Sequence, residues 1–329
     1  MKEQCFSIVA SAISVPERRV ESVEIDRELG LDEGSTENET GVATRYWASE
    51  ETSVVDIAVS AARKAMEAGG VNPGDLDLII NAGATPQQLL PCNAVLIHDK
   101  LGAPSHTSCF DVDQACLGFL PALDIAAHFL SSGYKDIVLI VCAETPSKFT
   151  NPATREAYRL LGDGAAAVVL SNTPTTKLLA TELWTLSSFK DFCKIVGGGT
   201  KLAGYEYNAD VHQQYFFDMD GHELFKGTWR SFPDMVRAFL DKNGLSVDDI
   251  DMYVPHQAAL SAMRLLQRNL KVSSERRLEI VQRFGNCGSA SIPMTLHLAM
   301  EEGRISSGDK ILLLGTGAGI TLGASLLVM

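Results

Sequence analysis

The chain has 329 residues, 46% of them hydrophobic, and a formal net charge of −13. This length can bury a large core and is typical of two domains or two fused halves. The acidic balance argues against nucleic acid as a bulk partner, although a small basic patch could still bind an acidic molecule. Seven cysteines with no C-x-x-C pair fit neither a disulfide framework nor a zinc site. We therefore expect reduced thiols, no metal site and a cytoplasmic location.

The first half of the chain alternates helical and strand-like segments. Residues 53–68 predict an amphipathic helix that ends at a Gly-Gly pair, and a turn leading into a buried strand follows at 72–80. The later segments are a strand at 107–112, a helix at 117–127, and strands at 133–140 and 164–170. The polar stretch 171–176, which contains a proline, predicts a boundary between domains 1–173 and 174–329.

The second half repeats this order, which indicates a weak internal duplication. Its matching segments are a helix at about 223–242, a turn and strand at 246–254, and strands at 308–314 and 323–328. Residues 311–329 are apolar, but four glycines interrupt them, so they predict two strands and a tight turn rather than a membrane span. The N-terminus is charged by residues 17–19 and does not read as a signal peptide. Alternating strands and helices predict an α/β fold of two similar halves, with mostly parallel sheets covered on both faces.

Cys116 lies where the predicted strand 107–112 gives way to the predicted helix 117–127. A thiol at the first turn of a helix faces unsatisfied backbone N–H groups and the positive end of the helix dipole, and both favour the thiolate. The alternative is a small buried core residue, and spacing alone does not decide between the two. We assign that core role to Cys5, Cys92, Cys109, Cys142 and Cys193.

Two later segments carry groups that such a thiolate could use. In one, an apolar strand ends on His256, which is either a structural histidine or a neutral imidazole that can accept or donate a proton. In the other, Asn286 lies in a turn bracketed by glycines. It either adopts a left-handed turn conformation or donates its amide to an enolate oxygen. Together with Cys116, these residues predict a Cys-His-Asn acyl-transfer site at the interface between the two halves.

The combination resembles the β-ketoacyl-acyl-carrier-protein synthase III family. The family's three active-site motifs match residues 111–119, 255–258 and 285–293. Its G-D-G-A turn, C-terminal glycine loop and early G-I-x-x-R motif match 161–165, 315–319 and 41–45. The resemblance runs from about residue 5 to the C-terminus. It implies a thiolase-like fold with layered α-β-α-β-α architecture, usually in a homodimer.

In this family a cysteine takes an acyl group from a thioester, and a malonyl-carrier thioester then loses carbon dioxide to give the enolate that attacks it. The resemblance implies that Cys116 is the nucleophile and that His256 and Asn286 stabilise the malonyl thioester oxygen. The backbone N–H groups of Cys116 and Ala318 would form the oxyanion hole, with alanine at a position that is usually glycine. No cofactor is expected, because acyl-coenzyme A or acyl-carrier thioesters serve as substrates.

The family's docking face for acyl carrier protein is basic. The resemblance assigns this role to Lys226 and to Arg264 and Arg268, which lie one turn apart on a predicted helix. Each of them could equally be an ordinary solvated charge. The family's asparagine and arginine in this region are replaced by Ala259 and Ser261, so we expect an altered docking surface.

The expected substrate pocket departs further from the family pattern. The segment that carries Glu37 and Glu39 is acidic and has no aromatic residue, whereas the family clamps the coenzyme A adenine there; Arg155 matches the other half of that clamp. Acidic side chains would repel the 3′-phosphate, which predicts a donor other than acetyl-coenzyme A. Leu90 stands where a phenylalanine often caps the acyl pocket across the dimer, and Phe225 is expected to contact substrate.

Three other functions fit parts of the pattern. An acyltransferase on the same fold would move the acyl group to an alcohol or amine without decarboxylation, and would need Cys116 and His256 more than Asn286. A hydroxymethylglutaryl-type or thiolase-type condensing enzyme needs a catalytic glutamate or a second cysteine, for which Cys287 is the only candidate. A catalytically idle carrier-binding protein is the third. Fatty-acid initiation and a specialised, polyketide-like pathway both remain open, and the altered primer segment favours the second.

Overall fold

The computed structural model describes residues 3–229 and 231–329. The helices are α1 (Ser22–Leu29), α2 (Ser35–Thr40), α3 (Val54–Gly69), α4 (Asn93–Leu101), α5 (Phe119–Ser131), α6 (Arg155–Leu160), α7 (Gly221–Trp229), α8 (Phe232–Lys242), α9 (Leu260–Leu270), α10 (Val281–Phe284) and α11 (Ser291–Glu301). The strands are β1 (Gln4–Ser14), β2 (Arg18–Glu21), β3 (Thr44–Trp47), β4 (Leu78–Asn81), β5 (Ser108–Asp111), β6 (Ile137–Glu144), β7 (Gly164–Thr185), β8 (Cys193–Lys194), β9 (Asp218–Met219), β10 (Met252–Pro255), β11 (Lys310–Gly317) and β12 (Thr321–Val328).

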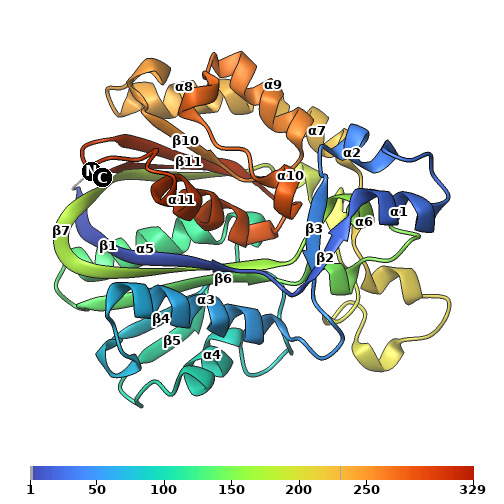
Figure 1. The fold of residues 1–329 in the computed structure, drawn as a ribbon, viewed down its shortest axis with the longest axis horizontal. Coiled ribbons are helices and arrows are strands. Elements are labelled where there is room, and N and C mark those ends of the chain that lie inside the picture. The colour runs from blue at the N-terminus through green and yellow to red at the C-terminus, as the bar shows by residue number, and fades with distance from the viewer. Residues whose placement is uncertain (1–2, 230) are drawn as a thin grey trace.

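The elements stack in five layers of alternating helix and strand (Figure 1). Helices α8 and α9 cover β10 and β11 on one side, and α5 and α11 fill the middle layer. Strands β1, β7 and β6 form the next layer, and α3 and α4 cover its outer side. The apolar side chains of the middle layer are buried between the sheets, including Leu120, Ala126, Ile292 and Met294. The expected layered α-β-α-β-α architecture is confirmed.

The main sheet joins its strands in the order β10-β11-β12-β7-β6-β4-β5, with β1 paired to β7. The pairs β10–β11, β4–β5 and β4–β6 are parallel, whereas β11–β12, β12–β7, β6–β7 and β1–β7 are antiparallel. The expectation of mostly parallel sheets is therefore wrong. A short turn folds β12 back along β11, and β7 runs back along β6, so the centre of the sheet is built from reversing strands.

Strand β7 connects the two halves. Residues 164–171 pair with β6, and residues 177–185 pair with β12. The polar stretch 171–176 is therefore part of a continuous strand, at the point where that strand exchanges one neighbour for another. The boundary between 173 and 174 falls at this exchange and stays a prediction.

The repeated pattern of the sequence corresponds to repeated structure. In the first half α3 leads through a short turn to β4, and in the second α8 leads through a similar turn to β10. The Asp77 carboxylate accepts the backbone N–H groups of Asp136 and Ile137, where β6 begins, at 2.9 and 3.0 Å. The Asp251 carboxylate accepts the N–H of Lys310 in the same way at 2.8 Å. Asp77 and Asp251 thus occupy equivalent positions in the two halves, and each holds the start of the corresponding strand, β6 or β11.

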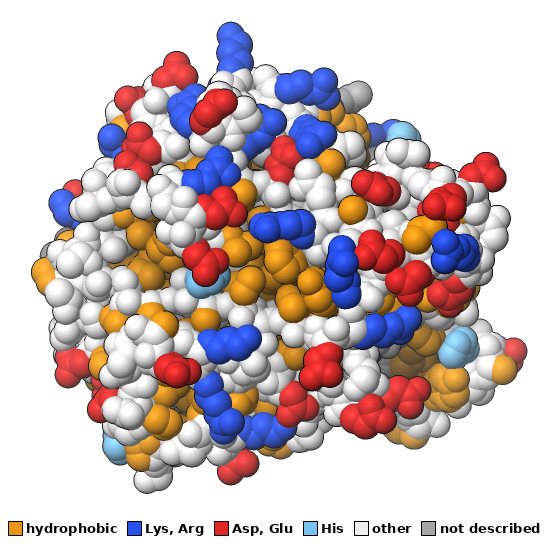
Figure 2. Space-filling view, viewed as in Figure 1, with side chains coloured by type: hydrophobic (Ala, Val, Ile, Leu, Met, Phe, Trp, Pro, Cys, Tyr) orange, Lys and Arg blue, Asp and Glu red, His pale blue; other side chains and the backbone are white. Residues whose placement is uncertain are grey.

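The helix expected at 223–242 is two helices, α7 and α8. Pro233 lies in the first turn of α8. Proline lacks a backbone N–H and clashes with the preceding turn, so it is tolerated where a helix begins but not in its interior. In the ranges 3–229 and 231–329, no helix is both long and apolar enough to cross a bilayer. Acidic and basic side chains interleave over the face drawn in Figure 2, without separating into patches of one sign.

Candidate active site

Cys116 lies in a 3-10 turn, Ala115–Leu117, between the end of β5 and the start of α5. Ala115 has a φ of +46°, a left-handed conformation that is unusual for a residue with a Cβ atom. A Cβ atom on Gly118 would lie 2.2 Å from the carbonyl oxygen of Ala82, so glycine is needed for the close approach of this turn to β4. The strand-to-helix junction expected from the sequence is confirmed, and the thiol lines a cavity.

The expectation of a stabilised thiolate is wrong. Burial raises the pKa of the Cys116 thiol above its ordinary value, and the nearby Cys193 and Glu144 raise it further. Hydrogen bonds from the backbone N–H groups of Ala318 and Cys116 lower the pKa, but they do not offset the loss of solvation. Cys116 therefore rests as a neutral thiol, held by the two N–H groups that the family resemblance assigns to the oxyanion hole.

His256 follows β10 and is only 4% exposed. Its backbone N–H donates to the Leu314 carbonyl on β11 at 2.8 Å. Its Nδ1 lies 2.6 Å from the Ser291 hydroxyl, which also accepts the N–H of Gln257 at 3.2 Å. A hydroxyl in that position can donate its own proton to Nδ1, which leaves Nε2 as the protonated ring nitrogen. Burial lowers the pKa of His256 to about 4, so the ring is neutral at pH 7.

Asn286 is 8% exposed, in the turn before α11. Its backbone N–H donates to the Leu160 carbonyl at 3.0 Å, and its carbonyl accepts the Gly162 N–H at 3.1 Å. The side-chain oxygen accepts the Gly288 N–H at 2.9 Å. Since the oxygen is engaged in its own turn, the amide nitrogen is the end of the side chain that can donate to a substrate.

One cavity of about 670 Å³ is lined by Cys116, His256, Asn286 and Ala318 together. These residues come from four segments that are far apart in the chain, and the fold brings them to one place as the sequence predicted. Arg155 and Phe225 also line this cavity. Ala318 does not adopt a positive φ, so alanine is accommodated where the family pattern has glycine.

The other assigned residues lie outside the cavity wall. Leu90 is 85% exposed on the loop between β4 and α4. Lys226 is exposed and forms an ion pair with Glu223 at 2.6 Å. The Arg264 guanidinium contacts Glu279 at 2.8 and 3.1 Å, and Arg268 is exposed on the same helix, α9. The substrate-capping and carrier-binding roles of these four residues stay predictions.

The acidic helix α2 was expected to repel the phosphate of coenzyme A through Glu37 and Glu39, but one of these glutamates is already paired. Glu39 forms an ion pair with Arg159 at 2.6 Å, and this contact lowers the pKa of the carboxyl. Glu37 is exposed on the same helix, α2. Arg155 lines the cavity and donates to the Leu29 carbonyl at 3.2 Å. Glu39, which lines the cavity, is therefore compensated by Arg159, whereas Glu37 is not among the described residues that line it.

Sequence reasoning missed three residues next to the reaction centre. Cys193, which we assigned to the core, lines the cavity near Cys116. The Ser291 hydroxyl lies within hydrogen-bonding distance of His256 and orients its ring. Ser291 belongs to the matched motif 285–293, so the motif could have indicated this role. Glu144 is buried and accepts the N–H groups of Ala84 and Thr85 and the Ser289 hydroxyl, at 2.8, 3.0 and 2.5 Å. Through these hydrogen bonds Glu144 connects the turn of Asn286 to the end of β6. No sequence motif indicated that role.

The other cysteines only partly match their expected core role. Cys142 is buried, whereas Cys5, Cys92 and Cys109 are partly exposed. All seven thiols are free. Cys287, the candidate second cysteine of a thiolase-type enzyme, is buried with its thiol directed at the Phe284 carbonyl at 3.4 Å. It lies outside the cavity wall, which argues against a thiolase-type role.

The chain is similar to known proteins along most of its length. The family model described as 3-oxoacyl-[acyl-carrier-protein (ACP)] synthase III matches residues 110–186, and its C-terminal counterpart matches residues 240–329. A β-ketoacyl-[acyl-carrier-protein] synthase III of Clostridioides difficile strain 630 is 33% identical over 311 residues, which is 94% of each chain. Its counterpart from Aquifex aeolicus VF5 is 32% identical and covers 97% of this chain and 98% of its own.

Solved structures give the same result over the whole length. The crystal structure of 3-oxoacyl-[acyl-carrier-protein] synthase III from Aquifex aeolicus VF5 superimposes with a TM-score of 0.87, covering 98% of this chain and 100% of that one. The synthase III from Pseudomonas aeruginosa PAO1, at 27% identity, also gives 0.87 and covers 98% of each chain. The expected thiolase-like fold is confirmed. The chain belongs to the β-ketoacyl-[acyl-carrier-protein] synthase III family.

Proposed function

We propose that this enzyme condenses an acyl group carried on Cys116 with a malonyl-carrier-protein thioester, releasing carbon dioxide and a β-ketoacyl product. The observation that carries the proposal is the shared cavity, in which a thiol, a neutral imidazole and a carboxamide meet two backbone N–H groups. These groups supply a nucleophile and hydrogen-bond donors for two separate oxyanions. The proposal requires no cofactor, because side chains and backbone N–H groups provide every group that the reaction uses.

In the first half-reaction, the Cys116 sulfur attacks the carbonyl carbon of the acyl thioester. The carbonyl oxygen gains negative charge and accepts the N–H groups of Cys116 and Ala318. The bond to the departing thiol then breaks, and that thiol leaves with the proton that Cys116 has lost. The product is a thioester between the acyl group and Cys116.

In the second half-reaction, the malonyl group loses its carboxylate as carbon dioxide, and the electron pair of the broken bond forms an enolate. We assign the N–H donors of His256 and Asn286 to the enolate oxygen. The enolate carbon attacks the acyl carbonyl carbon, the new carbon–carbon bond forms, and the Cys116 sulfur leaves and takes up a proton. A neutral imidazole suits this role, because the lowered pKa of His256 leaves it a hydrogen-bond donor that carries no buried charge.

The test is carbon dioxide release from malonyl-carrier protein after acylation, with Cys116→Ala as the matched control. We expect carbon dioxide and β-ketoacyl product in equal amounts from the natural chain, and no β-ketoacyl product from the variant, which has no sulfur to carry the acyl group. Transfer of the acyl group to an added alcohol or amine, with no carbon dioxide, would instead establish the rival acyltransferase.

We further propose an acyl donor other than acetyl-coenzyme A, either a longer acyl-coenzyme A or an acyl chain on a carrier protein. The support is the acidic helix α2 beside the cavity, where Glu39 lines the wall and pairs with Arg159 and Glu37 is exposed on the same helix. Intact-protein mass spectrometry of Cys116 acylation with a panel of donors tests this. Acetyl-coenzyme A outcompeting octanoyl and carrier-bound donors would contradict it.

We propose that acyl carrier protein docks on α7 and α9, although two of the three basic side chains assigned to this face already form ion pairs. Lys226 pairs with Glu223 and Arg264 pairs with Glu279, while Arg268 is exposed. We also propose a homodimer in a reducing compartment, the cytoplasm. The supports are the exposed Leu89 and Leu90, at 76% and 85%, and seven free thiols.

A further inference from the structure

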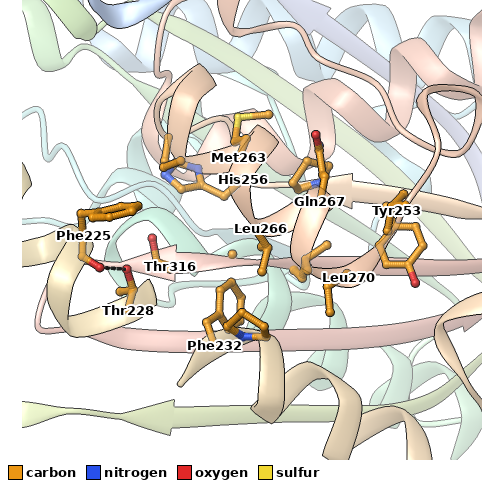
Figure 3. Close-up of a pocket in the computed structure, with 17 residues that line it drawn as sticks. Phe225, Thr228, Phe232, Tyr253, His256, Met263, Leu266, Gln267, Leu270 and Thr316 are labelled. Atoms are coloured by element: carbon orange, nitrogen blue, oxygen red, sulfur yellow. Dashed lines mark hydrogen bonds between the residues drawn. The ribbon is translucent and has the colours of Figure 1, made fainter. Parts of the chain in front are cut away.

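A smaller pocket branches from the active-site cavity. It runs between α9 on one side and α7 and α8 on the other, with β10 and β11 as its floor (Figure 3). Its volume is about 80 Å³, roughly half that of an engineered protein cavity that accepts benzene. The residues that line both spaces are Phe225, Thr228, His256, Ala258, Ala262 and Thr316.

Most of the side chains that line this side pocket are apolar, and one of the polar ones is buried without a hydrogen-bond partner. Gln267 lines the pocket and is only 4% exposed, yet neither its amide nitrogen nor its amide oxygen has a hydrogen-bond partner in the described part of the chain. A buried amide without a partner destabilises a folded protein, so such groups are rare unless something pairs with them. A ligand with a hydrogen-bonding atom in this pocket would satisfy the Gln267 amide.

The character of the walls limits what that ligand can be. Among the described residues that line the pocket, none carries a charge, because His256 is neutral and the others are apolar or uncharged. A charged group would lose its hydration without compensation. The volume and the lining together fit a short, neutral chain of roughly four non-hydrogen atoms that includes one oxygen.

The position of the pocket indicates which substrate reaches it. His256 lines the side pocket, whereas Cys116 and Asn286 line only the larger cavity. The Cys116 sulfur, and the acyl carbonyl that it would carry, therefore lie outside the side pocket. The carbon donor, whose thioester oxygen we assign to His256, lies next to its mouth. The small side chains of Ala258 and Ala262 leave that mouth open.

We propose that this pocket is a subsite for a short neutral substituent on the α-carbon of the malonyl donor, and that Gln267 donates a hydrogen bond to an oxygen in that substituent. This inference rests on the proposed function. An α-substituted malonyl thioester loses carbon dioxide in the same way as malonyl, and its substituted enolate gives an α-branched β-ketoacyl product. The enzyme would thus choose its carbon donor as well as its acyl group.

The experiment compares three donors on carrier protein: malonyl, butylmalonyl and 2-methoxyethylmalonyl. The two substituents have equal numbers of non-hydrogen atoms and differ by one oxygen. Gln267→Leu removes the amide at similar volume, and the matched control is Gln282→Leu, a half-buried glutamine on α10 outside both cavities. The readout is the ratio of kcat/KM for the two substituted donors, which does not depend on the fraction of folded enzyme.

The natural chain and Gln282→Leu should favour 2-methoxyethylmalonyl, and Gln267→Leu should lower that ratio about tenfold, as expected for the loss of one buried hydrogen bond. The same ratio in Gln267→Leu, or a natural chain that uses malonyl and rejects both substituted donors, would overturn the subsite alone. Failure of the natural chain to condense malonyl, despite acylated Cys116, would overturn the proposed function and the subsite with it.

Discussion

At the residue scale, burial sets the protonation of Cys116 and His256 in the active-site cavity. It raises the pKa of Cys116 and lowers the pKa of His256 to about 4. Each shift favours the uncharged form, since a buried charge loses its hydration. In the resting protein Cys116 is therefore a thiol and His256 a neutral imidazole, and the two do not form an ion pair.

The lowered pKa of His256 predicts a specific dependence of stability on pH. A histidine with a pKa of about 6.5 in the unfolded chain binds protons there more tightly than in the folded protein. The contribution of neutral His256 to the free energy of unfolding is fully present above pH 6.5, and it is lost as the pH falls towards 4. We expect the free energy of unfolding to fall about 2–3 kcal/mol more between pH 7.5 and 4.5 in the natural chain than in His256→Gln. Urea titrations measure this, and equal pH dependence in both proteins would contradict it.

Replacing Asn286 by alanine should separate the two half-reactions. Its amide is assigned to the enolate oxygen and not to the acyl oxyanion. We expect Asn286→Ala to lower the rate of carbon dioxide release by about 100-fold, the effect of losing one oxyanion donor, while Cys116 is acylated at the natural rate. Rapid-quench mass spectrometry follows acylation, and trapped carbon dioxide follows decarboxylation. A parallel loss in both steps would show that the asparagine serves the fold of its turn instead.

The sequence predicted which residues would meet in one cavity, but it did not predict their electrostatic state. Short motifs carry Cys116, His256 and Asn286 with their neighbours. Solvation depends instead on everything that covers a group, and Glu144 and Cys193 near Cys116 come from distant segments. The helix dipole is a local property that a sequence reveals, and burial outweighs it here.

At the element scale, the site is assembled where strands end. Cys116 follows β5, His256 follows β10, and Ala318 lies in the turn between β11 and β12. The turn of Asn286 precedes α11. Residues just beyond the end of a strand lie in loops, and the sheet fixes where each loop begins. This explains how residues far apart in sequence can be held in one geometry.

Gly315 on β11 shows how closely these elements pack. A Cβ atom there would lie 2.4 Å from the Cβ atom of His256. We expect Gly315→Ala to displace the imidazole, to lower stability by about 1–3 kcal/mol and to slow carbon dioxide release. Gly199→Ala is the matched control, since a Cβ atom there meets nothing within 4 Å. Thermal unfolding and turnover measure both effects, and the prediction would be wrong if the two variants behaved alike.

Sequence patterns predicted the separate elements better than their connections. Helix α3 and its Ser53 cap follow directly from helical spacing and a capping residue. The break between α7 and α8 was missed, because apolar spacing continues across it and only Pro233 marks the new start. The antiparallel centre of the sheet was missed as well, because strand direction depends on how β7 and β12 turn back, which periodicity does not record.

At the scale of the whole molecule, the two halves are joined by β7 and by the middle layer of α5 and α11 (Figure 1). The duplicated pattern in the sequence predicted this symmetry, and the structure supplies the reason for it. Each half buries one helix of the middle layer against the other half, so neither half has a complete core alone. The cavity lies where these halves meet, with Cys116 from the first half and His256 from the second.

Two exposed leucines in the loop before α4 lead us to expect a dimer. Leu90 is 85% exposed beside an exposed Leu89, which is unfavourable unless another surface covers them. We expect the natural chain to elute as a dimer and Leu90→Asp to shift it towards monomer. Light scattering coupled to size exclusion measures the mass, with Tyr205→Asp, at an exposed tyrosine of another loop, as control. A monomeric natural chain would contradict the proposed dimer.

The central claim is that one cavity performs both half-reactions, and a single turnover of pre-acylated enzyme tests it most directly. Enzyme carrying one acyl group on Cys116 is mixed with malonyl-carrier protein, and the loss of that group is followed together with carbon dioxide. We expect one carbon dioxide and one β-ketoacyl product for each acyl group lost. Loss of the acyl group without carbon dioxide, or carbon dioxide without a new carbon–carbon bond, would contradict the account.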